Sequence, residues 1–374
     1  MRIPFNKPYF SGDELLHIKD AIEKGYISGN YEYTKKCHQF FEENYGFQKC
    51  LLTHSCTAAL EMAALLLDLK DGDEVIMPSY TFVSTANAFI LRGVKVVFAD
   101  VEKEIPNLSP KAVEAKITDK TKAIVLVHYA GIACDMDAFV ALAKKYNLHL
   151  IEDAAQAIDS FYKGKPLGSF GTFSTFSFHE TKNINCGEGG MLVINDASFN
   201  KRAEVIWEKG TNRAAFYRGE IDKYGWVDVG SSYLPSEITA AYLWAQLQNI
   251  EQIQHKRKHI WNKYLSAFQN AELDKKFLLP HVPNFATNNA HIFWMVCNSI
   301  EERQAIIERL KAAGILAVFH YQSLHLSNFY LKESKKENLP NTEKFSDCLL
   351  RLPLYVELEE NVVEEIINIL VKSA

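Results

Sequence analysis

Residues 177–190 read SFHETKNINCGEGG and directly follow the apolar stretch GTFSTF at 171–176. An aromatic and β-branched run of that kind predicts a strand, and the polar and glycine-rich residues after it predict that the strand ends near Ser177. Lys182 then stands among small polar residues and glycines, with little apolar cover around it. The position of this amine just beyond a strand end raises the question of which other residues lie near it, and the arrangement of the remaining strands answers that question.

Similar apolar runs occur on both sides of this stretch. Helix-length segments with apolar residues at three-to-four spacing, such as TAALEMAALLLDL, separate them. Strands that are apolar on both faces and alternate with helices predict a largely parallel sheet covered on both sides, and therefore an α/β fold. The carboxyl ends of such strands share one edge of the sheet, where ligands bind. The runs are 49–55, 73–81, 95–101, 122–130, 148–155 and 190–196.

The sequence pattern changes after about residue 245. A long charged helical stretch leads into short strand-like pieces that alternate with two further helical segments. We therefore predict a large domain over residues 1–245, including an N-terminal arm, and a smaller C-terminal α+β domain over residues 246–374, with the long helix as the hinge. The helical stretch and the pieces that follow it occupy 245–268, 291–298, 299–314, 314–322 and 361–373.

The composition is that of a globular protein and argues against several functional classes. The chain has 374 residues, 48% of them hydrophobic, which is enough for a sizeable core and for two domains. Its 41 Lys and Arg residues against 46 Asp and Glu residues give a net charge of −5, which does not support binding to nucleic acid or to an anionic membrane. The most apolar helical run, AALEMAALLL, is shorter than the ~18 residues of a membrane span.

The cysteines indicate a reducing compartment. They are odd in number, scattered and without a C-x-x-C pair, so neither a disulfide framework nor a structural zinc site is predicted. The first residues, MRIPFNKPYF, lack the apolar core of a signal peptide. We therefore expect a cytoplasmic protein without a bound metal. The cysteines are Cys37, Cys50, Cys56, Cys134, Cys186, Cys297 and Cys348.

Polar and aromatic residues that follow the predicted strands are expected to gather at one sheet edge. They comprise an amine, two carboxylates and an amide, a hydroxyl-rich helix start and an aromatic ring beside small hydroxyls. This set suits an aldehyde cofactor that carries a phosphate and a heteroaromatic nitrogen, which is pyridoxal 5′-phosphate. The residues are Lys182, Glu152, Asp153, Gln156, Ser55, Cys56, Thr57 and Phe82.

The chemistry of this cofactor explains why each residue type is needed. The lysine must lose a proton before it can react with the aldehyde, and a partly desolvated position favours that loss. The ring withdraws electrons only while its nitrogen is protonated, and Asp153 could hold that proton. The helix start in SCTAAL offers free N–H groups to the phosphate, with Thr57 and Ser177 as further donors. Phe82 could stack on the ring.

Each residue also has a simpler interpretation. A single lysine after a strand is usually a solvated surface residue, Asp153 could cap a helix, and Phe82 could belong to the core. CGEGG does not fit the dinucleotide motif G-x-G-x-x-G, and HETKN lacks the second histidine of the zinc motif H-E-x-x-H. The functional interpretation therefore depends on the whole set meeting at one edge.

Several of these segments resemble one known family. SFHETKNINCGEGG, EDAAQA, PSYTFVSTANA and GDEVIMPSYTF are similar to segments of the DegT-type nucleotide-sugar aminotransferases, which are fold type I pyridoxal phosphate enzymes, and the resemblance covers nearly the whole chain. It implies a mostly parallel seven-stranded sheet in the large domain. HYAGIACDMDA, EKGTNR, DKYGWVDVGSSYLPSE and AVFHYQSLH most resemble the members that use L-glutamate to convert dTDP-4-oxo-6-deoxy-D-glucose into dTDP-4-amino-4,6-dideoxy-D-galactose for surface polysaccharide.

The resemblance also implies roles for individual residues. Lys182 would be the base that reacts with the cofactor, and Asp153 would pair with its pyridine nitrogen. Gln156 would contact the ring hydroxyl and Phe82 would stack on the ring. The phosphate would be held by the backbone at Thr57 and Ala58 and by Ser177. The substrate contacts implied by the resemblance are His320, Tyr321, Arg213 and Tyr224.

Family members are homodimers whose active sites borrow residues from the partner subunit. The borrowed stretch usually reads G-x-N-Y-R-M, whereas this chain reads GSSYLPSE. Ser232 and Leu234 therefore stand where asparagine and arginine are expected. The phosphate contact across the dimer would be made by Ser232.

Alternatives on the same fold remain open. The substrate could be a 3-keto sugar or a sugar carried by another nucleotide, and the product could have the gluco configuration at C4. Sugar 3-dehydratases resemble this family but carry histidine at the lysine position, so Lys182 argues against that activity. A noncatalytic regulator would not be expected to keep Lys182, Asp153 and Gln156 together.

Overall fold

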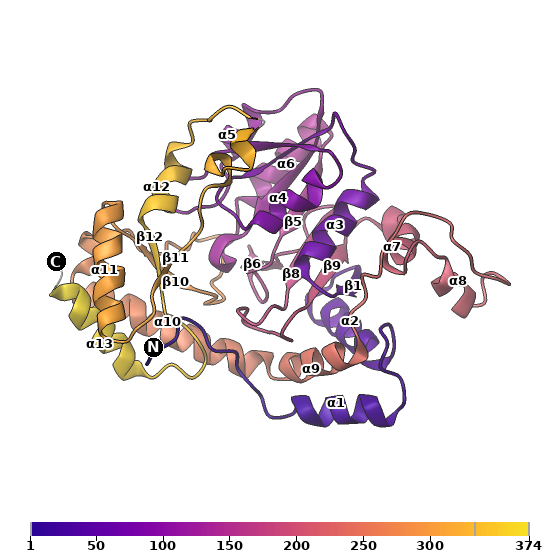
Figure 1. The fold of residues 1–374 in the computed structure, drawn as a ribbon, viewed down its shortest axis with the longest axis horizontal. Coiled ribbons are helices and arrows are strands. Elements are labelled where there is room, and N and C mark those ends of the chain that lie inside the picture. The colour runs from indigo at the N-terminus through magenta and orange to yellow at the C-terminus, as the bar shows by residue number, and fades with distance from the viewer. Residues whose placement is uncertain (1, 333, 373–374) are drawn as a thin grey trace.

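A computed structural model describes residues 2–332 and 334–372 and contains a central seven-stranded sheet (Figure 1). Its strand order is β1-β9-β8-β5-β4-β2-β3, and β9 alone runs in the direction opposite to the other six strands. This confirms the predicted α/β fold with a mostly parallel sheet. The strands are β1 (Lys49–Thr53), β2 (Glu74–Pro78), β3 (Lys95–Ala99), β4 (Thr121–Val127), β5 (His149–Asp153), β8 (Phe173–Ser177) and β9 (Gly190–Ile194).

Helices cover both faces of this sheet, which is why its strands are apolar on both sides. The two hydrophobic clusters lie on opposite faces and draw alternate residues from the same strands. For example, Ile76 of β2 belongs to one cluster, and Val75 and Met77 belong to the other. One face carries α3 (Cys56–Leu66), α4 (Val83–Ile90) and α7 (Asn200–Trp207); the other carries α2 (Glu32–Tyr45), α5 (Pro110–Glu114), α6 (Met136–Tyr146) and α9 (Glu237–Gln248), with α1 (Glu14–Glu23) packed on α9.

The C-terminal part forms a second, smaller sheet with its own core. Its three strands are antiparallel in the order β10-β12-β11, and the predicted strand-like pieces include β10 and β11. We did not predict β12 or α12 from the sequence. The elements are α10 (Ile250–Asn270), β10 (Phe293–Val296), α11 (Ile300–Ala312), β11 (Val318–Phe319), α12 (Pro340–Cys348), β12 (Leu349–Leu352) and α13 (Glu360–Val371).

The long helical stretch expected over 245–268 is interrupted at Asn249. Helix α9 ends at Gln248 and α10 begins at Ile250. The Asn249 side chain donates a hydrogen bond to the carbonyl of Ala245 at 2.9 Å, and such a side-chain contact competes with the backbone ladder. The predicted domain boundary at 245/246 lies just before this break. The N-terminal arm lies against the small domain, since Ile3 bridges to Ile315.

Shorter elements complete the fold. A small hairpin joins β6 (Phe161–Tyr162) to β7 (Lys165–Pro166), and α8 (Arg213–Tyr217) projects from the body of the molecule beyond α7 (Figure 1). Among residues 2–332 and 334–372, no helix combines the length and the apolar character that crossing a bilayer requires.

Candidate active site

A cavity of about 810 Å³ lies between the carboxyl edge of the large sheet and the small domain. It is large enough for a small-molecule ligand of considerable size. The structure brings ten of the predicted residues to its wall: Ser55, Cys56, Thr57, Phe82, Asp153, Gln156, Ser177, Lys182, His320 and Tyr321.

Lys182 lies in the turn between β8 and β9. Backbone hydrogen bonds from Phe178 to Gly189 and from Cys186 to Phe178, both at 2.8 Å, close the base of this loop. Burial lowers the pKa of Lys182 below its ordinary value, and the guanidinium of Arg351 acts in the same direction. The amine therefore gives up its proton more easily than an exposed lysine does.

Asp153 ends β5 and directs its carboxylate to the cavity. Its Oδ2 accepts a hydrogen bond from the Thr85 hydroxyl at 2.7 Å, and its Oδ1 accepts one from the Ala155 N–H at 3.1 Å. Thr85 is itself bonded to Thr81 at 2.8 Å, so the carboxylate is fixed in orientation. Burial raises the pKa of Asp153 even so, because no cation is in direct contact with it in the described part of the chain. A cationic ligand group would relieve that cost.

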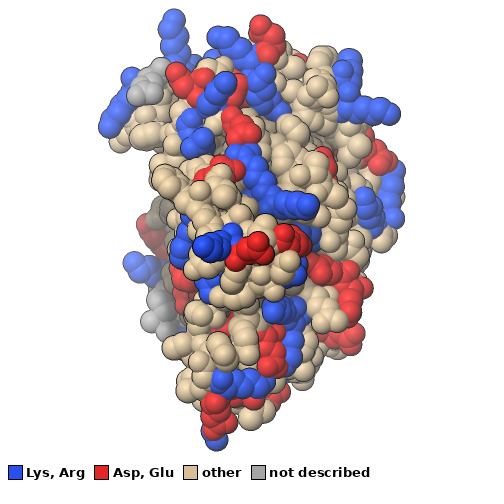
Figure 2. Space-filling view, turned by 90° about the vertical axis from the view of Figure 1, so that its right-hand side faces the viewer, with Lys and Arg blue, Asp and Glu red and all other residues tan. Residues whose placement is uncertain are grey.

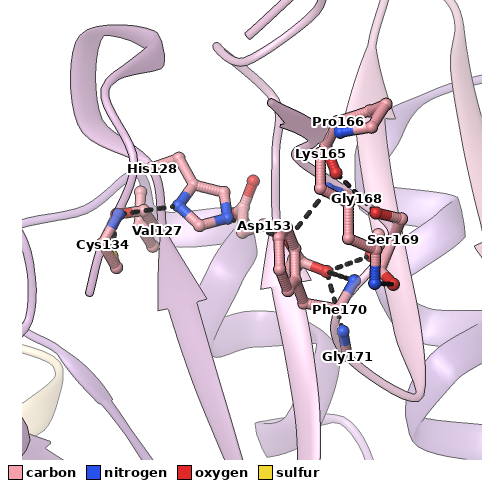
Figure 3. A network of polar contacts seen from close by, with 12 residues as sticks. Val127, His128, Cys134, Asp153, Lys165, Pro166, Gly168, Ser169, Phe170 and Gly171 are labelled. Atoms are coloured by element: carbon pink, nitrogen blue, oxygen red, sulfur yellow. Dashed lines mark hydrogen bonds and ion pairs between the residues drawn. The ribbon is translucent and has the colours of Figure 1, made fainter. Parts of the chain in front are cut away.

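Glu152 precedes Asp153 and points to the opposite face of the sheet, because side chains alternate along a strand. Its carboxylate accepts N–H donors from Gly168, Phe170 and Gly171, each at 2.8 Å, and lies 3.1 Å from Nε2 of His128. Figure 3 labels these four partners on both sides of the end of β5. This carboxylate is therefore a structural anchor for the loop before β8 and not a second catalytic acid.

The start of α3 offers two free backbone donors to the cavity. Ser55 caps the helix by accepting the Ala58 N–H at 3.1 Å, so that N–H is already used. The N–H groups of Cys56 and Thr57 have no acceptor among the described residues. A Cβ on Gly190 would lie 2.4 Å from the Cys56 nitrogen, so only glycine lets β9 approach this helix start so closely.

Hydroxyl groups surround this helix start. The Thr57 hydroxyl donates to Ser84 at 2.8 Å, which joins the first turns of α3 and α4, and Ser177 ends β8 on the same cavity wall. Free N–H groups together with hydroxyls at the N-terminus of an eleven-residue helix form an anion site of the kind that binds phosphate.

Phe82 and Gln156 complete this wall. Phe82 is 56% exposed, so it is not a core residue, and its ring faces the cavity. The Gln156 side chain accepts the Ala130 N–H at 2.7 Å and donates to the Tyr321 hydroxyl at 3.0 Å. Tyr321 belongs to the small-domain side, so Gln156 links the two sides of the cavity.

Sequence reasoning missed Arg351, Thr85, Ser84 and His291, all of which line the cavity. Arg351 lies on β12, within the otherwise apolar run CLLRLPL, and that isolated charge was the available signal. Its guanidinium lies 4.4 Å from the centroid of the Phe5 ring. In residues 2–332 and 334–372 its Nε has no hydrogen-bond partner.

The chain matches the DegT/DnrJ/EryC1/StrS aminotransferase family over residues 9–371. It is 32% identical over 374 residues to an uncharacterized protein of Methanocaldococcus jannaschii, covering 98% of this chain and 96% of that protein. This chain is a member of the DegT/DnrJ/EryC1/StrS aminotransferase family. Its cofactor is pyridoxal 5′-phosphate, on which the family depends.

Solved structures agree with this assignment. The aminotransferase TlmJ from Streptoalloteichus hindustanus superposes with a TM-score of 0.91 at 27% identity, over 99% of this chain and 98% of that one. The putative sugar aminotransferase Spr1654 from Streptococcus pneumoniae, in its PMP form, gives a TM-score of 0.91 at 26% identity, over 100% and 98%. The same protein in its PLP form gives 0.90.

The residues of this aminotransferase fit its cofactor. The anion site at the start of α3 suits the phosphate, the under-compensated carboxylate of Asp153 suits a protonated ring nitrogen, and the Lys182 amine faces the same space. Ala58 contributes only the helix, since its N–H is taken by Ser55.

Three predicted residues do not line the cavity of their own chain. Ser232 is exposed and bridges to Glu208. Arg213 donates to the Tyr217 hydroxyl, and Tyr224 is exposed and packs near Phe216. Arg213 and Tyr224 belong to residues 213–229, which we call the projecting segment, and Ser232 lies just after it.

The anchoring role of Glu152 predicts a pH-dependent loss of stability in Glu152→Gln. Burial opposes ionisation, but His128 and the N–H groups of Gly171 and Gly168 hold the pKa of Glu152 below its ordinary value. The stabilisation is therefore complete above the unfolded pKa of about 4.3 and is lost as the pH falls through the folded value. We expect the variant to lose about 3 kcal/mol at pH 7 in urea unfolding, and less in acid.

Glu114→Gln is the matched control, because Glu114 forms an exposed ion pair with Lys145. It should change stability little at either pH. A deficit in Glu152→Gln that stayed constant from neutral to acid pH would contradict an ionised Glu152.

Proposed function

We propose that this aminotransferase moves an amino group from L-glutamate to C4 of dTDP-4-oxo-6-deoxy-D-glucose, giving dTDP-4-amino-4,6-dideoxy-D-galactose for surface polysaccharide. The observation that carries the proposal is a lysine amine, a buried carboxylate and a phosphate site on the wall of one cavity. The size of that cavity, about 810 Å³, supports a large second substrate beside the cofactor. The similarity to Spr1654 of S. pneumoniae, described as a putative sugar aminotransferase, supports a sugar as the acceptor.

Each residue of the cavity wall would have its own role in this reaction. Pyridoxal phosphate, when bound, supplies the electron sink that makes the α-hydrogen of an amino acid acidic. Nζ of Lys182 takes that proton from glutamate and later delivers a proton to C4 of the sugar, which its lowered pKa favours. Asp153 holds the ring nitrogen protonated, and Thr85 keeps its carboxylate in place. Gln156 and Phe82 orient the ring from its edge and its face.

The decisive experiment identifies both the product and the reacting lysine. Incubation with glutamate and dTDP-4-oxo-6-deoxy-D-glucose should give the 4-amino-galacto product by mass and NMR. Borohydride reduction followed by peptide mass mapping should place the cofactor on Lys182. Lys182→Ala should bind the cofactor without a covalent link and lose turnover by several orders of magnitude.

Other results of this experiment would redirect the proposal. Preferential amination of a 3-keto isomer, or of a sugar on another nucleotide, would change the assigned substrate. A gluco product would mean that C4 receives its proton on the opposite face of the sugar ring. Turnover in Lys182→Ala at the normal rate would remove Lys182 from catalysis. We also infer a cytoplasmic enzyme, which the seven free thiols support.

Arg351 supports an amino-acid donor. Burial lowers its pKa, and within the described residues it forms no ion pair. A buried cation without a counter-ion is costly, and a carboxylate at this wall would remove that cost. We infer that Arg351 binds a carboxylate of glutamate, close to the reacting amine at Lys182.

This assignment predicts a selective defect. Arg351→Met should lower kcat/KM for glutamate, measured as release of 2-oxoglutarate in a single turnover, by about ten- to hundred-fold. Arg351→Lys should recover only part of it, because an ammonium lacks the planar fork of donors. A defect confined to the sugar half-reaction would instead place the nucleotide diphosphate at Arg351 and contradict the assignment.

The projecting segment supports a homodimer with shared active sites. Trp226 is 84% exposed, and Tyr217, Tyr224, Val227 and Val229 are exposed around it, more apolar surface than an isolated loop usually presents. This segment lies on the face that carries α8, where Figure 2 shows charges of both signs interspersed with uncharged surface. We infer that a second copy covers it and that Ser232, Arg213 and Tyr224 serve the partner's cavity.

Light scattering tests the dimer. The protein should have twice the mass of its chain, and Trp226→Glu should shift it toward the monomer, since a charge would be buried at the contact. Val140→Glu, on α6, changes a residue that is 41% exposed and should leave the mass unchanged. A monomeric wild-type protein with full activity would refute shared sites.

A further inference from the structure

His291 lies on the cavity wall near Lys182 and has no role in the proposals above. It is 4% exposed and follows Asn289 in the segment that leads into β10. Its Nδ1 is 2.9 Å from Oδ1 of Asn183, the residue next to Lys182. Which of the two ring nitrogens carries the proton decides what this histidine offers to a ligand.

The orientation of the Asn183 side chain is fixed by its other partners. Its Nδ2 donates to the backbone carbonyl of Asn289 and to Oε1 of Gln254, each at 2.8 Å. A backbone carbonyl can only accept, so the nitrogen of the Asn183 amide must lie on this side and the oxygen must face His291. The Nδ1 atom of His291 is therefore the protonated one.

The hydrogen bonds of Gln254 support the same orientation of the Asn183 amide. Its Nε2 donates to Oδ2 of Asp159 at 3.1 Å, and a carboxylate oxygen accepts, so its Oε1 is left to accept from Asn183. A directional chain of hydrogen bonds thus begins at Asp159 and passes through Gln254 and Asn183 to His291. We call these four residues the Asp159–His291 chain.

Asn289 holds the chain rigidly in place. Its side-chain nitrogen donates to the carbonyls of Gln156 and Ile158, each at 2.8 Å, and its Oδ1 accepts the backbone N–H of His291 at 3.0 Å. A Cβ on Gly131 would lie 2.1 Å from that Oδ1, so the neighbouring turn also fits closely around it. The imidazole has little freedom to turn over.

The consequence is a fixed acceptor in the active cavity. Because Nδ1 carries the proton, Nε2 presents a lone pair, and no described residue donates to it. Burial holds the pKa of His291 well below its ordinary value, and Lys182, Arg257 and Arg351 add to the effect, so the ring stays neutral. A neutral acceptor does not attract a phosphate or a carboxylate, and it selects a ligand that donates a hydrogen bond.

We propose that the Asp159–His291 chain presents Nε2 of His291 as an acceptor for one ring hydroxyl of the sugar substrate. This rests on the proposed function and names the part of that substrate which His291 recognises. Glutamate offers no hydroxyl, and its amine is the group transferred. The hexose offers two ring hydroxyls, one on C3 beside the keto carbon and one on C2, and both can donate a hydrogen bond.

The test combines variants with substrate analogues. His291→Leu should lower kcat/KM for the keto sugar on the order of ten-fold and lower the glutamate half-reaction less. Analogues in which one ring hydroxyl is replaced by fluorine, which cannot donate, should lose a similar factor with the wild-type enzyme. The analogue at the recognised carbon should lose nothing further with His291→Leu, so the two changes are non-additive. His291→Gln, which keeps an acceptor oxygen, should recover part of the loss.

The protonation of the ring is tested separately. Nitrogen NMR of the histidine-labelled holoenzyme should show His291 with Nδ1 protonated and Nε2 unprotonated across the working pH range. Asn183→Leu should abolish that fixed pattern and lower kcat/KM for the sugar, although His291 itself is retained. A signal from protonated Nε2 in the wild-type protein would overturn the proposal.

The outcomes separate this inference from the proposed function. Amination of the sugar with fully additive effects at every hydroxyl, or an equal loss in both half-reactions, would overturn the role of His291 alone. Failure to aminate any keto sugar nucleotide would overturn the proposed function together with the sugar ligand.

Discussion

The desolvation of an amine and a carboxylate on the walls of one cavity is the constraint on which this structure depends. No ion pair joins Lys182 to Asp153 among the described residues, and burial moves the pKa of each toward the neutral form. Neither shift would persist if the two side chains could meet. The strand end at Asp153 and the loop between β8 and β9 bring both side chains to the wall of one cavity, which suits pyridoxal phosphate. A protonated ring nitrogen would supply the positive charge that the described residues do not bring into contact with Asp153.

The sheet makes this separation possible by using its two faces differently. Glu152 and Asp153 are neighbours in sequence, yet the carboxylate of Glu152 accepts three backbone N–H groups, whereas that of Asp153 accepts one N–H and one hydroxyl beside the cavity. The first fixes the loop that leads into β8, and β8 in turn leads to Lys182. A buried structural carboxylate on one face of the sheet thereby supports the cavity wall on the other.

The sequence allowed much of this to be predicted. Strands that are apolar on both faces are recognisable without a structure, and the residues that follow them must meet at one edge of the sheet. Lys182, Asp153 and Phe82 could therefore be predicted as neighbours. Arg351 and His291 were not predicted to line the cavity, because they belong to the small domain. Periodicity in the sequence does not reveal how that domain is placed relative to the sheet. The break at Asn249 was also missed, because the helical pattern of the sequence continues through it and only the structure shows the side-chain hydrogen bond of Asn249 to Ala245.

The Asp159–His291 chain draws on both domains, because Gln254 lies on α10, the helix that enters the small domain. Selectivity for the sugar in this cavity therefore depends on residues from both domains and cannot be assigned to either domain alone. Transplanting only the wall residues from a relative would carry over the imidazole without the partners that determine its proton. An engineered hybrid would have to include both the interdomain helix and the loop at Asp159 from the same parent protein. Recombination between diverged relatives is restricted in the same way.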